Sequence, residues 1–300
     1  MKKMHSLEHF AQAPQESDGY QRHNNAVAPE VITFLKDECD LREFFVEKPM
    51  QGVLSKSYRI EKEEGVAVQI AGNAEVPRAE NVQRLFTIYL HRNATGYKID
   101  DDERKMNKDD PGYEARKMQN AMKRMLKKER LDMTQVFIAA PQGVQNVTGG
   151  LTNLNVSVIK AAIDAMIASA VDDDIEPTVA FMSYAAFRQL QADPDFKYIP
   201  EVFQKILLEG KFNEGGRNRT AISGPTGQYI DGVEIYIVNE LGNDIILLDE
   251  TKEALWLAED QEPTITAYRD DEHISDIVDI RHDQQPVCVR PECLYKIHIQ

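Results

Sequence analysis

The residues best suited to chemistry in this chain are clusters of glycine, acidic residues, histidine and cysteine. The glycines from Gly210 to Gly227 include the run GPTGQY, which differs from the G-x-x-x-x-G-K-[ST] sequence of phosphate-binding loops. No G-x-G-x-x-G follows a strand-like segment either. A mobile loop lying against other copies of the chain explains these glycines better than nucleotide binding does. The segment therefore predicts no cofactor-binding residue.

Four acidic runs could be imagined as cation sites, but none has the EF-hand spacing D-x-[DN]-x-[DN]-G-x₅-E, so solvated turns are favoured. The seven histidines form neither an HExxH pair nor an H-x-E pattern with CxxC, and no G-x-S-x-G elbow is present. We therefore predict no metal site, no catalytic residue and no enzymatic activity. The acidic runs are Asp100 to Asp102, Asp109 with Asp110, Asp172 to Asp174, and Asp270 to Glu272.

The three cysteines, Cys39, Cys288 and Cys293, form neither a paired framework nor a metal knuckle, which indicates ordinary thiols in a reducing compartment. The N-terminal sequence MKKMHSLEHFAQAPQESDGYQ lacks an apolar signal region. No run approaches the roughly 20 apolar residues of a membrane span. We expect a soluble protein that is made inside a cell and has no membrane contact.

The composition favours a globular chain that is acidic as a whole. Of 300 residues, 42% are hydrophobic, and 50 acidic side chains against 35 basic ones give a net charge of −15. Such a chain can bury a substantial core, as one elaborate domain or two lobes. A basic nucleic-acid binder of the usual kind is excluded, so any contact with DNA must be local.

One basic patch does stand out, on the segment from Asp110 to Thr134. Met118, Ala121, Met122, Met125 and Leu126 follow the i, i+3, i+4, i+7, i+8 spacing of a long amphipathic helix. The opposite face has two interpretations. It is either a solvated surface that complements the helix dipole, or a contact for phosphates or an acidic neighbour. Its members are Arg116, Lys117, Lys123, Arg124, Lys127, Lys128 and Arg130.

A second distinctive segment, from Met50 to Ile99, alternates apolar and polar residues outward and back around the polar stretch AGNAEVPRAENVQ. This pattern predicts a long β-hairpin with a soft tip. A lone hairpin is marginal in water because one of its faces has nothing to pack against. The hairpin therefore needs another surface, such as another subunit.

Other elements surround these two. Residues 1–27 are polar and predict an arm, and a short helix is expected from Pro29. A helix from Val156 to Ala170, a strand from Thr178 to Met182, a helix capped by Ser183 and a helix near Pro200 predict an α/β lobe. Beyond the glycine-rich segment, residues from Tyr229 onward predict a meander of short strands.

This ordered set resembles the capsid fold of tailed bacteriophages, the Hong Kong-phage type that encapsulins share. The resemblance lies in TGQYIDGVEIYIVNEL, in PTVAFMSYAAFRQL, and in the returning strands of DIILLDETKEALWLAEDQEPTITAYRDDEHISDIVDIRHDQQPVCVRPECLYKI. It implies an α+β fold with an N-terminal arm at 1–49, an extended hairpin loop at 50–99 and a peripheral domain with the spine helix at 100–149. An axial domain would follow at 150–258, and return strands of the peripheral domain at 259–300.

The resemblance also implies a function. The chain would be a major capsid protein that self-assembles into pentamers and hexamers of an icosahedral or prolate shell enclosing double-stranded DNA. It would be assembled in the host cytoplasm and located in the virion. Identical subunits would be its partners, with scaffolding, portal and decoration proteins as further candidates. DNA would be contacted weakly through Arg116, Lys117, Lys123, Arg124, Lys127 and Lys128. Some members cross-link an extended-loop lysine to an asparagine; Lys56 and Lys62 lie in that loop, but no pattern singles out an acceptor.

Two alternatives stay open. An encapsulin shell has the same fold and holds an enzyme instead of a genome, but those proteins begin with a cargo-docking helix, whereas this N-terminus is polar. A soluble α/β enzyme with an Asp/Glu site predicts a small oligomer with a deep pocket. Particle size and contents distinguish all three classes.

Overall fold

The computed structural model describes residues 39–64, 80–108, 110, 112–169, 175–196, 224–260, 264–270 and 272–300, with side chains left undescribed at 60–64 and 80–84. The chain divides into two compact units: unit 1 comprises residues 1–56, 89–132 and 257–286, and unit 2 comprises 57–88, 133–256 and 287–300. Helices and strands are mixed in both, which confirms the predicted α+β class. The predicted arm at 1–27, the helix from Pro29, the hairpin tip and the helix near Pro200 lie outside the described residues.

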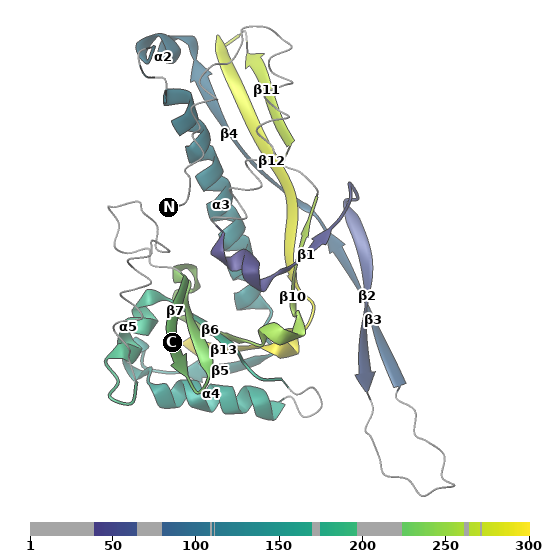
Figure 1. The fold of residues 1–300 in the computed structure, drawn as a ribbon, viewed down its shortest axis with the longest axis vertical. Coiled ribbons are helices and arrows are strands. Elements are labelled where there is room, and N and C mark those ends of the chain that lie inside the picture. The colour runs from purple at the N-terminus through teal and green to yellow at the C-terminus, as the bar shows by residue number, and fades with distance from the viewer. Residues whose placement is uncertain are drawn as a thin grey trace, which may run out of the picture. The chain divides into compact units, whose positions relative to one another are not determined.

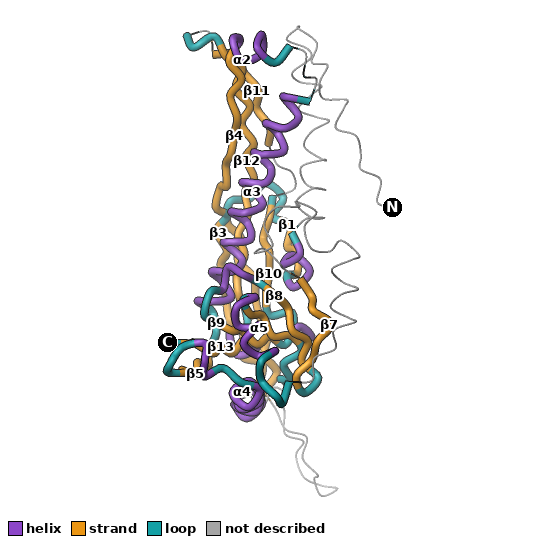
Figure 2. The backbone as a smooth tube through the Cα atoms, turned by 90° about the vertical axis from the view of Figure 1, so that its left-hand side faces the viewer, coloured by secondary structure: helices purple, strands orange, loops and turns teal. Residues whose placement is uncertain are grey.

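Unit 1 contains a five-stranded sheet and most of one long helix. The sheet has the order β1 (Val46–Pro49), β10 (Leu255–Glu259), β12 (Ser275–Cys288) and β11 (Thr264–Asp270), and β4 (His91–Asp100) also pairs with β12. β4 and β12 are antiparallel, with Asp100 opposite Ser275 and His91 opposite Gln284. The helix α3 (Tyr113–Ala139) lies alongside β4 and β12 in both views (Figures 1 and 2).

The apolar stripe of α3 explains its place on this sheet. Met118, Ala121, Met122 and Met125 are buried, and they form one core cluster with Ile265 of β11 and Ile280 of β12. This confirms the stripe predicted from the sequence. The predicted helix ended near Thr134, whereas α3 continues to Ala139, because Met133 and Phe137 extend the buried stripe by another turn.

The acidic run Asp100 to Asp102 is not the solvated turn that was predicted. Asp101–Met106 form the short helix α2, with Asp100 in the extended conformation at its N-cap. Asp101, Asp102 and Glu103 all lie in the first turn of the helix. Carboxylates there complement the positive end of the helix dipole, which is why an acidic run starts a helix at this point.

Unit 2 is built on a six-stranded sheet with the order β5-β13-β9-β6-β8-β7. The helix α4 (Val156–Ser169) packs against β5, β13 and β7, and α5 (Tyr184–Gln191) begins at Ser183, whose hydroxyl accepts the Ala186 N–H at 3.4 Å. These helices and the strand before α5 confirm the predictions for the segment from Val156 to Leu190. The strands are β5 (Gly143–Val147), β13 (Leu294–Ile299), β9 (Asp244–Leu248), β6 (Val179–Met182), β8 (Val233–Ile237) and β7 (Gly224–Ile230).

Two sequence predictions for the second half of the chain are wrong. The expected meander of short strands is instead interrupted by the 14-residue strand β12, and β13 pairs in parallel with β5. The polar run HDQQ resembles a break between two short strands, but His282 and Gln284 in that run are buried within β12. The predicted domain boundaries at 150 and 258 stay predictions.

The second error concerns the end of the glycine-rich segment. Gly224, Pro225 and Gly227 lie in strand β7, not in a loop, although the earlier glycines fall outside the described residues. Gly224 and Gly227 have φ of 119° and 64°, and the pairing of β7 with β8 shifts register between Pro225 and Tyr229. Glycines that serve a β-bulge resemble loop glycines in a sequence.

Candidate assembly surface

The predicted hairpin is present as a separate two-stranded sheet of β2 (Ser55–Glu64) and β3 (Glu80–Tyr89). The hydroxyls of Ser57 and Thr87 lie 2.9 Å apart across the two strands. Successive side chains of a strand point to opposite faces, so Leu85 and Tyr89 share the face of Thr87. Leu85 is 68% exposed and Tyr89 is 64% exposed. This face, which we call the hairpin outer face, therefore exposes two large apolar side chains, Leu85 and Tyr89, beside the hydroxyls of Ser57 and Thr87.

The opposite face of the hairpin is packed. The ring of Tyr58 meets the ring of Trp256 edge to face, with centroids 5.3 Å apart and planes at 75°, and both residues belong to unit 2. Ile88 is buried as well. Since one face already has its partner within the chain, the outer face is left for a partner outside it.

The turn that leads into the hairpin is tightly fixed within unit 1. Gln51 and Gly52 both have positive φ, 55° and 78°, which is typical of a type I′ turn. The Gly52 N–H donates to the Asp260 carboxylate at 2.9 Å, and the Met50 N–H donates to the Glu259 carbonyl at 3.0 Å. Val53 and Leu54, just after this turn, are exposed apolar residues.

The basic face predicted on α3 exists, but most of its charge is already neutralised inside unit 1. Arg116 pairs with Asp110, Lys117 with Glu103, Lys128 with Asp132, and Arg130 with Asp40. Arg124 donates to the backbone carbonyl of Gly96 at 3.1 Å. Lys123 and Lys127 are exposed, and neither has an ion-pair partner among the described residues. Three of the six residues predicted to contact DNA, Lys123, Arg124 and Lys127, therefore have no carboxylate partner among the described residues.

A buried cluster of charged residues lies elsewhere in unit 1 and was not predicted. Arg42, in the short 3-10 helix η2 (Asp40–Phe44), donates from Nε to Glu129 of α3 at 2.5 Å and from Nη1 to Glu259 of β10 at 3.1 Å. Glu129 is fully buried and the Arg42 side chain is 6% exposed. His282 of β12 places Nε2 3.8 Å from Glu259. Glu47 of β1 lies 3.6 Å from Arg42. We call these five residues the Arg42 cluster.

Burial dominates the acid–base behaviour of the Arg42 cluster. It raises the pKa of the Glu129 carboxyl, with Arg42 opposing the shift and Glu259 adding to it. Burial also raises the pKa of the nearby Cys39 thiol to about 12, with further contributions from Glu129 and Asp40. A thiol so poorly ionised is a weak nucleophile.

Sequence reasoning missed Glu129 because it stands in the charged run KKER. A signal was available: Glu129 lies four residues after Met125 and four before Met133, so it falls on the apolar stripe of α3. Arg42, Glu259 and His282 carry no comparable signal, since only the fold brings them together.

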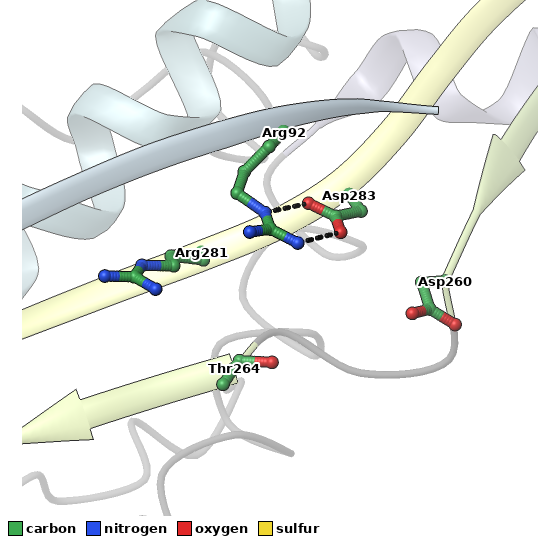
Figure 3. A pocket seen from close by; sticks show the side chains of 5 residues that line it. All are labelled: Arg92, Asp260, Thr264, Arg281 and Asp283. Carbon is green, nitrogen blue, oxygen red and sulfur yellow. Dashed lines mark hydrogen bonds and ion pairs between the residues drawn. The ribbon is translucent and has the colours of Figure 1, made fainter. Parts of the chain in front are cut away.

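A surface depression of about 250 Å³ lies beside β4 and β12, lined by Arg92, Asp260, Thr264, Arg281 and Asp283. Figure 3 shows the Arg92 guanidinium facing the Asp283 carboxylate, to which it donates two hydrogen bonds of 2.8 and 2.9 Å. The Asp260 carboxylate is engaged by the Gly52 amide. Arg281 pairs with Asp279, so each charged side chain that lines the depression has a partner.

The other residues considered in the sequence, two lysines and the acidic runs, are dispersed. Lys56 is exposed on β2, and the side chain of Lys62 lies outside the described residues. Asp101 is held by Arg269, and a hydrogen bond from Arg269 lowers the pKa of the Asp101 carboxyl. Asp270 is bound by His273 at 2.8 Å. Within the described ranges, no three His, Cys, Asp or Glu side chains gather closely enough to hold a metal ion.

No helix in the described part of the chain is both long and apolar enough to cross a membrane.

Comparison with known proteins identifies the fold. No family model and no curated protein matches the chain. Solved structures do. A chain from Gordonia phage Cozz matches with a TM-score of 0.62 at 8% identity, over 87% of this chain and 86% of that chain.

Two further structures match at similar strength. A chain from the head structure of Helicobacter pylori bacteriophage KHP40 has a TM-score of 0.59 at 10% identity, over 85% and 86% of the two chains. A chain from a virus-like particle of Pyrococcus furiosus matches with a TM-score of 0.57 at 10% identity, over 92% of this chain and 99% of that chain. The chain therefore has the tailed-phage capsid fold of the Hong Kong-phage type, as the sequence predicted.

Proposed function

We propose that this chain is the major capsid protein of a tailed virus, a subunit that assembles with copies of itself into pentamers and hexamers of a closed shell around double-stranded DNA. The observation that carries the proposal is the uncovered outer face of the β2–β3 hairpin, with Leu85 and Tyr89 more than 60% exposed. An apolar face that its own chain leaves uncovered needs a partner, and a second copy supplies one at every position of a symmetric shell. The near-full-length likeness to phage head proteins supports this reading.

The proposed domains follow from the same comparison. Residues 1–49 would form the arm, 50–99 the extended hairpin loop, 150–258 the axial domain, and 100–149 with 259–300 the peripheral domain. These bounds put the strands β5 and β13 in the peripheral domain, although both strands pair within the six-stranded sheet of unit 2. We therefore propose that both strands belong with the axial domain. In this proposal the subunit is structural and has no catalytic residue. It is assembled in the host cytoplasm and is located in the virion. Scaffolding, portal and decoration proteins are its candidate partners.

We infer that DNA contact is weak and rests mainly on Lys123 and Lys127. These two lysines are exposed and have no ion-pair partner among the described residues, whereas Arg116, Lys117 and Lys128 are paired with carboxylates. Together with Arg124, which bonds only backbone carbonyls, they give a non-specific attraction for phosphates that falls with salt and is repeated over the inner surface of a shell.

A second candidate is a cellular compartment that holds protein. It is favoured by the Pyrococcus furiosus virus-like particle, whose chain is covered to 99%. The contents of purified particles separate the two functions: nuclease-resistant double-stranded DNA supports the viral shell, and a protein filling overturns it.

The proposal is tested by size-exclusion chromatography and negative-stain microscopy of the purified full chain, alone and with a scaffolding protein from the same genome. Closed particles of uniform size are expected in at least one of the two preparations. A stable monomer or dimer at high concentration in both would overturn the shell function.

A further inference from the structure

Glu129 is an unusual acid because it is buried without a full set of hydrogen bonds. Its side chain has no exposed surface, and Oε1 accepts the Arg42 Nε at 2.5 Å. Oε2 has no hydrogen-bond partner among the described residues. A buried ionised carboxylate is costly unless both of its oxygens are solvated or paired, so this environment favours the neutral form.

The charges around Glu129 add to that preference. Arg42 is shared among three carboxylates, because it also lies 3.1 Å from Glu259 and 3.6 Å from Glu47. From α3 itself, Asp132 adds negative charge, and from β12 the imidazole of His282 faces Glu259. The neighbouring cation Arg130 is paired with Asp40, and the Cys39 thiol lies close by. Negative charge exceeds positive charge in this cluster when all its carboxyls are ionised.

The Arg42 cluster also joins the segment from Cys39 to Pro49 to the rest of unit 1. Arg42 belongs to η2 and Glu47 to β1, so the side chains of the segment from Cys39 to Pro49 contribute one half of the cluster. Glu129 and Glu259, from α3 and β10, contribute the other half. Leu41 and Phe45 are buried and anchor the same segment by apolar contact. The segment from Cys39 to Pro49 is therefore fixed to unit 1 partly through a group that can gain or lose a proton.

We propose that Glu129 is a proton-dependent latch: when it is protonated, the segment from Cys39 to Pro49 is held more tightly to unit 1 than when it is ionised. Protonation of Glu129 lowers the excess of negative over positive charge in the Arg42 cluster, and Arg42 keeps its hydrogen bond to Glu259 and its ion pair with Glu47. Ionisation leaves a buried charge with one unpartnered oxygen. The latch regulates how firmly the segment from Cys39 to Pro49 is docked on unit 1. It operates in the single subunit whether or not shells form.

The direction of the pH dependence follows from the raised pKa of the Glu129 carboxyl. Burial raises the pKa of Glu129 in the folded protein above its value in the unfolded chain. The stabilising contribution is therefore fully present below the unfolded pKa of about 4.3, and it is lost as the pH rises through the folded pKa. The docked segment becomes looser as the pH increases, which is opposite to the behaviour of the paired surface aspartates.

Hydrogen exchange of the full chain, followed by mass spectrometry between pH 5 and pH 8 and corrected for the intrinsic exchange rate, tests the latch. Peptides covering 41–49 should become less protected as the pH rises, by about tenfold for each pH unit of difference between the folded and unfolded pKa. Glu129→Gln should keep these peptides equally protected at both ends of the range. Glu114→Gln, a carboxylate on the same helix that pairs with Arg104 at the surface, should behave as wild type.

Wild-type protection at 41–49 that does not change with pH would overturn the latch, and so would a pH dependence in Glu129→Gln equal to that of Glu114→Gln. If Glu129→Gln does not fold, Glu259→Gln tests the same idea, because Glu259 adds to the upward shift of the Glu129 pKa. In Glu259→Gln, the pH at which peptides covering 41–49 lose half of their protection should be lower than in the wild type. An unmoved midpoint, or one moved to higher pH, would contradict the assignment.

Discussion

Tyr58 of β2 and Trp256 of β10 meet edge to face with ring centroids 5.3 Å apart, which packs one face of the β2–β3 hairpin against another segment of unit 2. Leu85, on the other face of the same hairpin, is left exposed. The hairpin therefore has one face that stabilises its own chain and one face that is free for another.

The ring pair should contribute measurably to stability. Edge-to-face aromatic pairs are worth about 0.5–1.5 kcal/mol beyond the area they bury. A double-mutant cycle with Tyr58→Leu and Trp256→Leu, measured by urea unfolding of the unassembled chain, should return a coupling free energy in that range. A coupling near zero would mean that the hairpin is not held by this contact.

Leu85→Asp should block assembly without unfolding the subunit. Because Leu85 is exposed, replacing it should change the free energy of unfolding of the monomer little. A carboxylate buried at a subunit interface is strongly unfavourable. Closed particles should disappear on negative-stain grids while circular dichroism stays that of wild type. Leu85→Met, which keeps the apolar volume, is the matched control and should still assemble. Normal particles from Leu85→Asp would remove the hairpin outer face from the interface.

Arg42→Met should be strongly destabilising. It leaves Glu129 and Glu259 without their shared cation, and breaking a buried ion pair by removing one partner costs about 3–5 kcal/mol. Arg92→Met is the comparison, because Arg92 makes a two-bond pair with Asp283 at the surface, where such pairs contribute little. Equal urea midpoints for the two variants would contradict the buried character of the Arg42 cluster.

The elements with regular periodicity were predictable, whereas those that depend on long-range pairing were not. The spacing of the buried residues Met118, Met122 and Met125 was enough to predict the helix α3, and Ser183 predicted where α5 begins. The length of β12 was not predicted, because its buried His282 and Gln284 look like surface residues in the sequence. Their burial results from pairing with β4, a strand almost 200 residues earlier in the chain, which local sequence cannot reveal.

The candidate site shows the same limit. The sequence predicted a hairpin that needs another surface, but it did not show which face stays exposed, because Leu85, Phe86, Ile88, Tyr89 and Leu90 do not alternate strictly with polar residues. The neutralisation of the basic helix face was not predictable either, since Asp40, Glu103 and Asp110 reach α3 from segments outside that helix. Charge counted along one helix overstates the charge available to a partner.

The stability of the unassembled chain should fall in acid. A hydrogen bond from Arg92 lowers the pKa of Asp283, and one from Arg116 lowers that of Asp110. Because these folded pKa values are depressed, their contribution is present above the unfolded pKa of about 3.9 and is lost as the pH falls through the folded pKa. The urea midpoint should drop below about pH 4, and less steeply in Asp283→Asn. A midpoint unchanged between pH 5 and pH 3 would contradict these pairings.

The cysteines should differ in reactivity. Burial raises the pKa of Cys39 and of Cys293 to about 12, and both side chains are buried, whereas Cys288 is partly exposed. Alkylation of the native protein at pH 8, read by peptide mass spectrometry, should label Cys288 first, and urea should make all three react. Rapid native labelling of Cys39 would mean that the segment around it is not docked as described.

If copies of this chain close into a shell by covering the hairpin outer face, cryo-electron microscopy of the purified particles will show the covering. Leu85 and Tyr89 of each subunit should be buried against a neighbouring copy in a closed symmetric shell. A shell in which both side chains still face solvent, or no closed particle at all, would contradict this proposal.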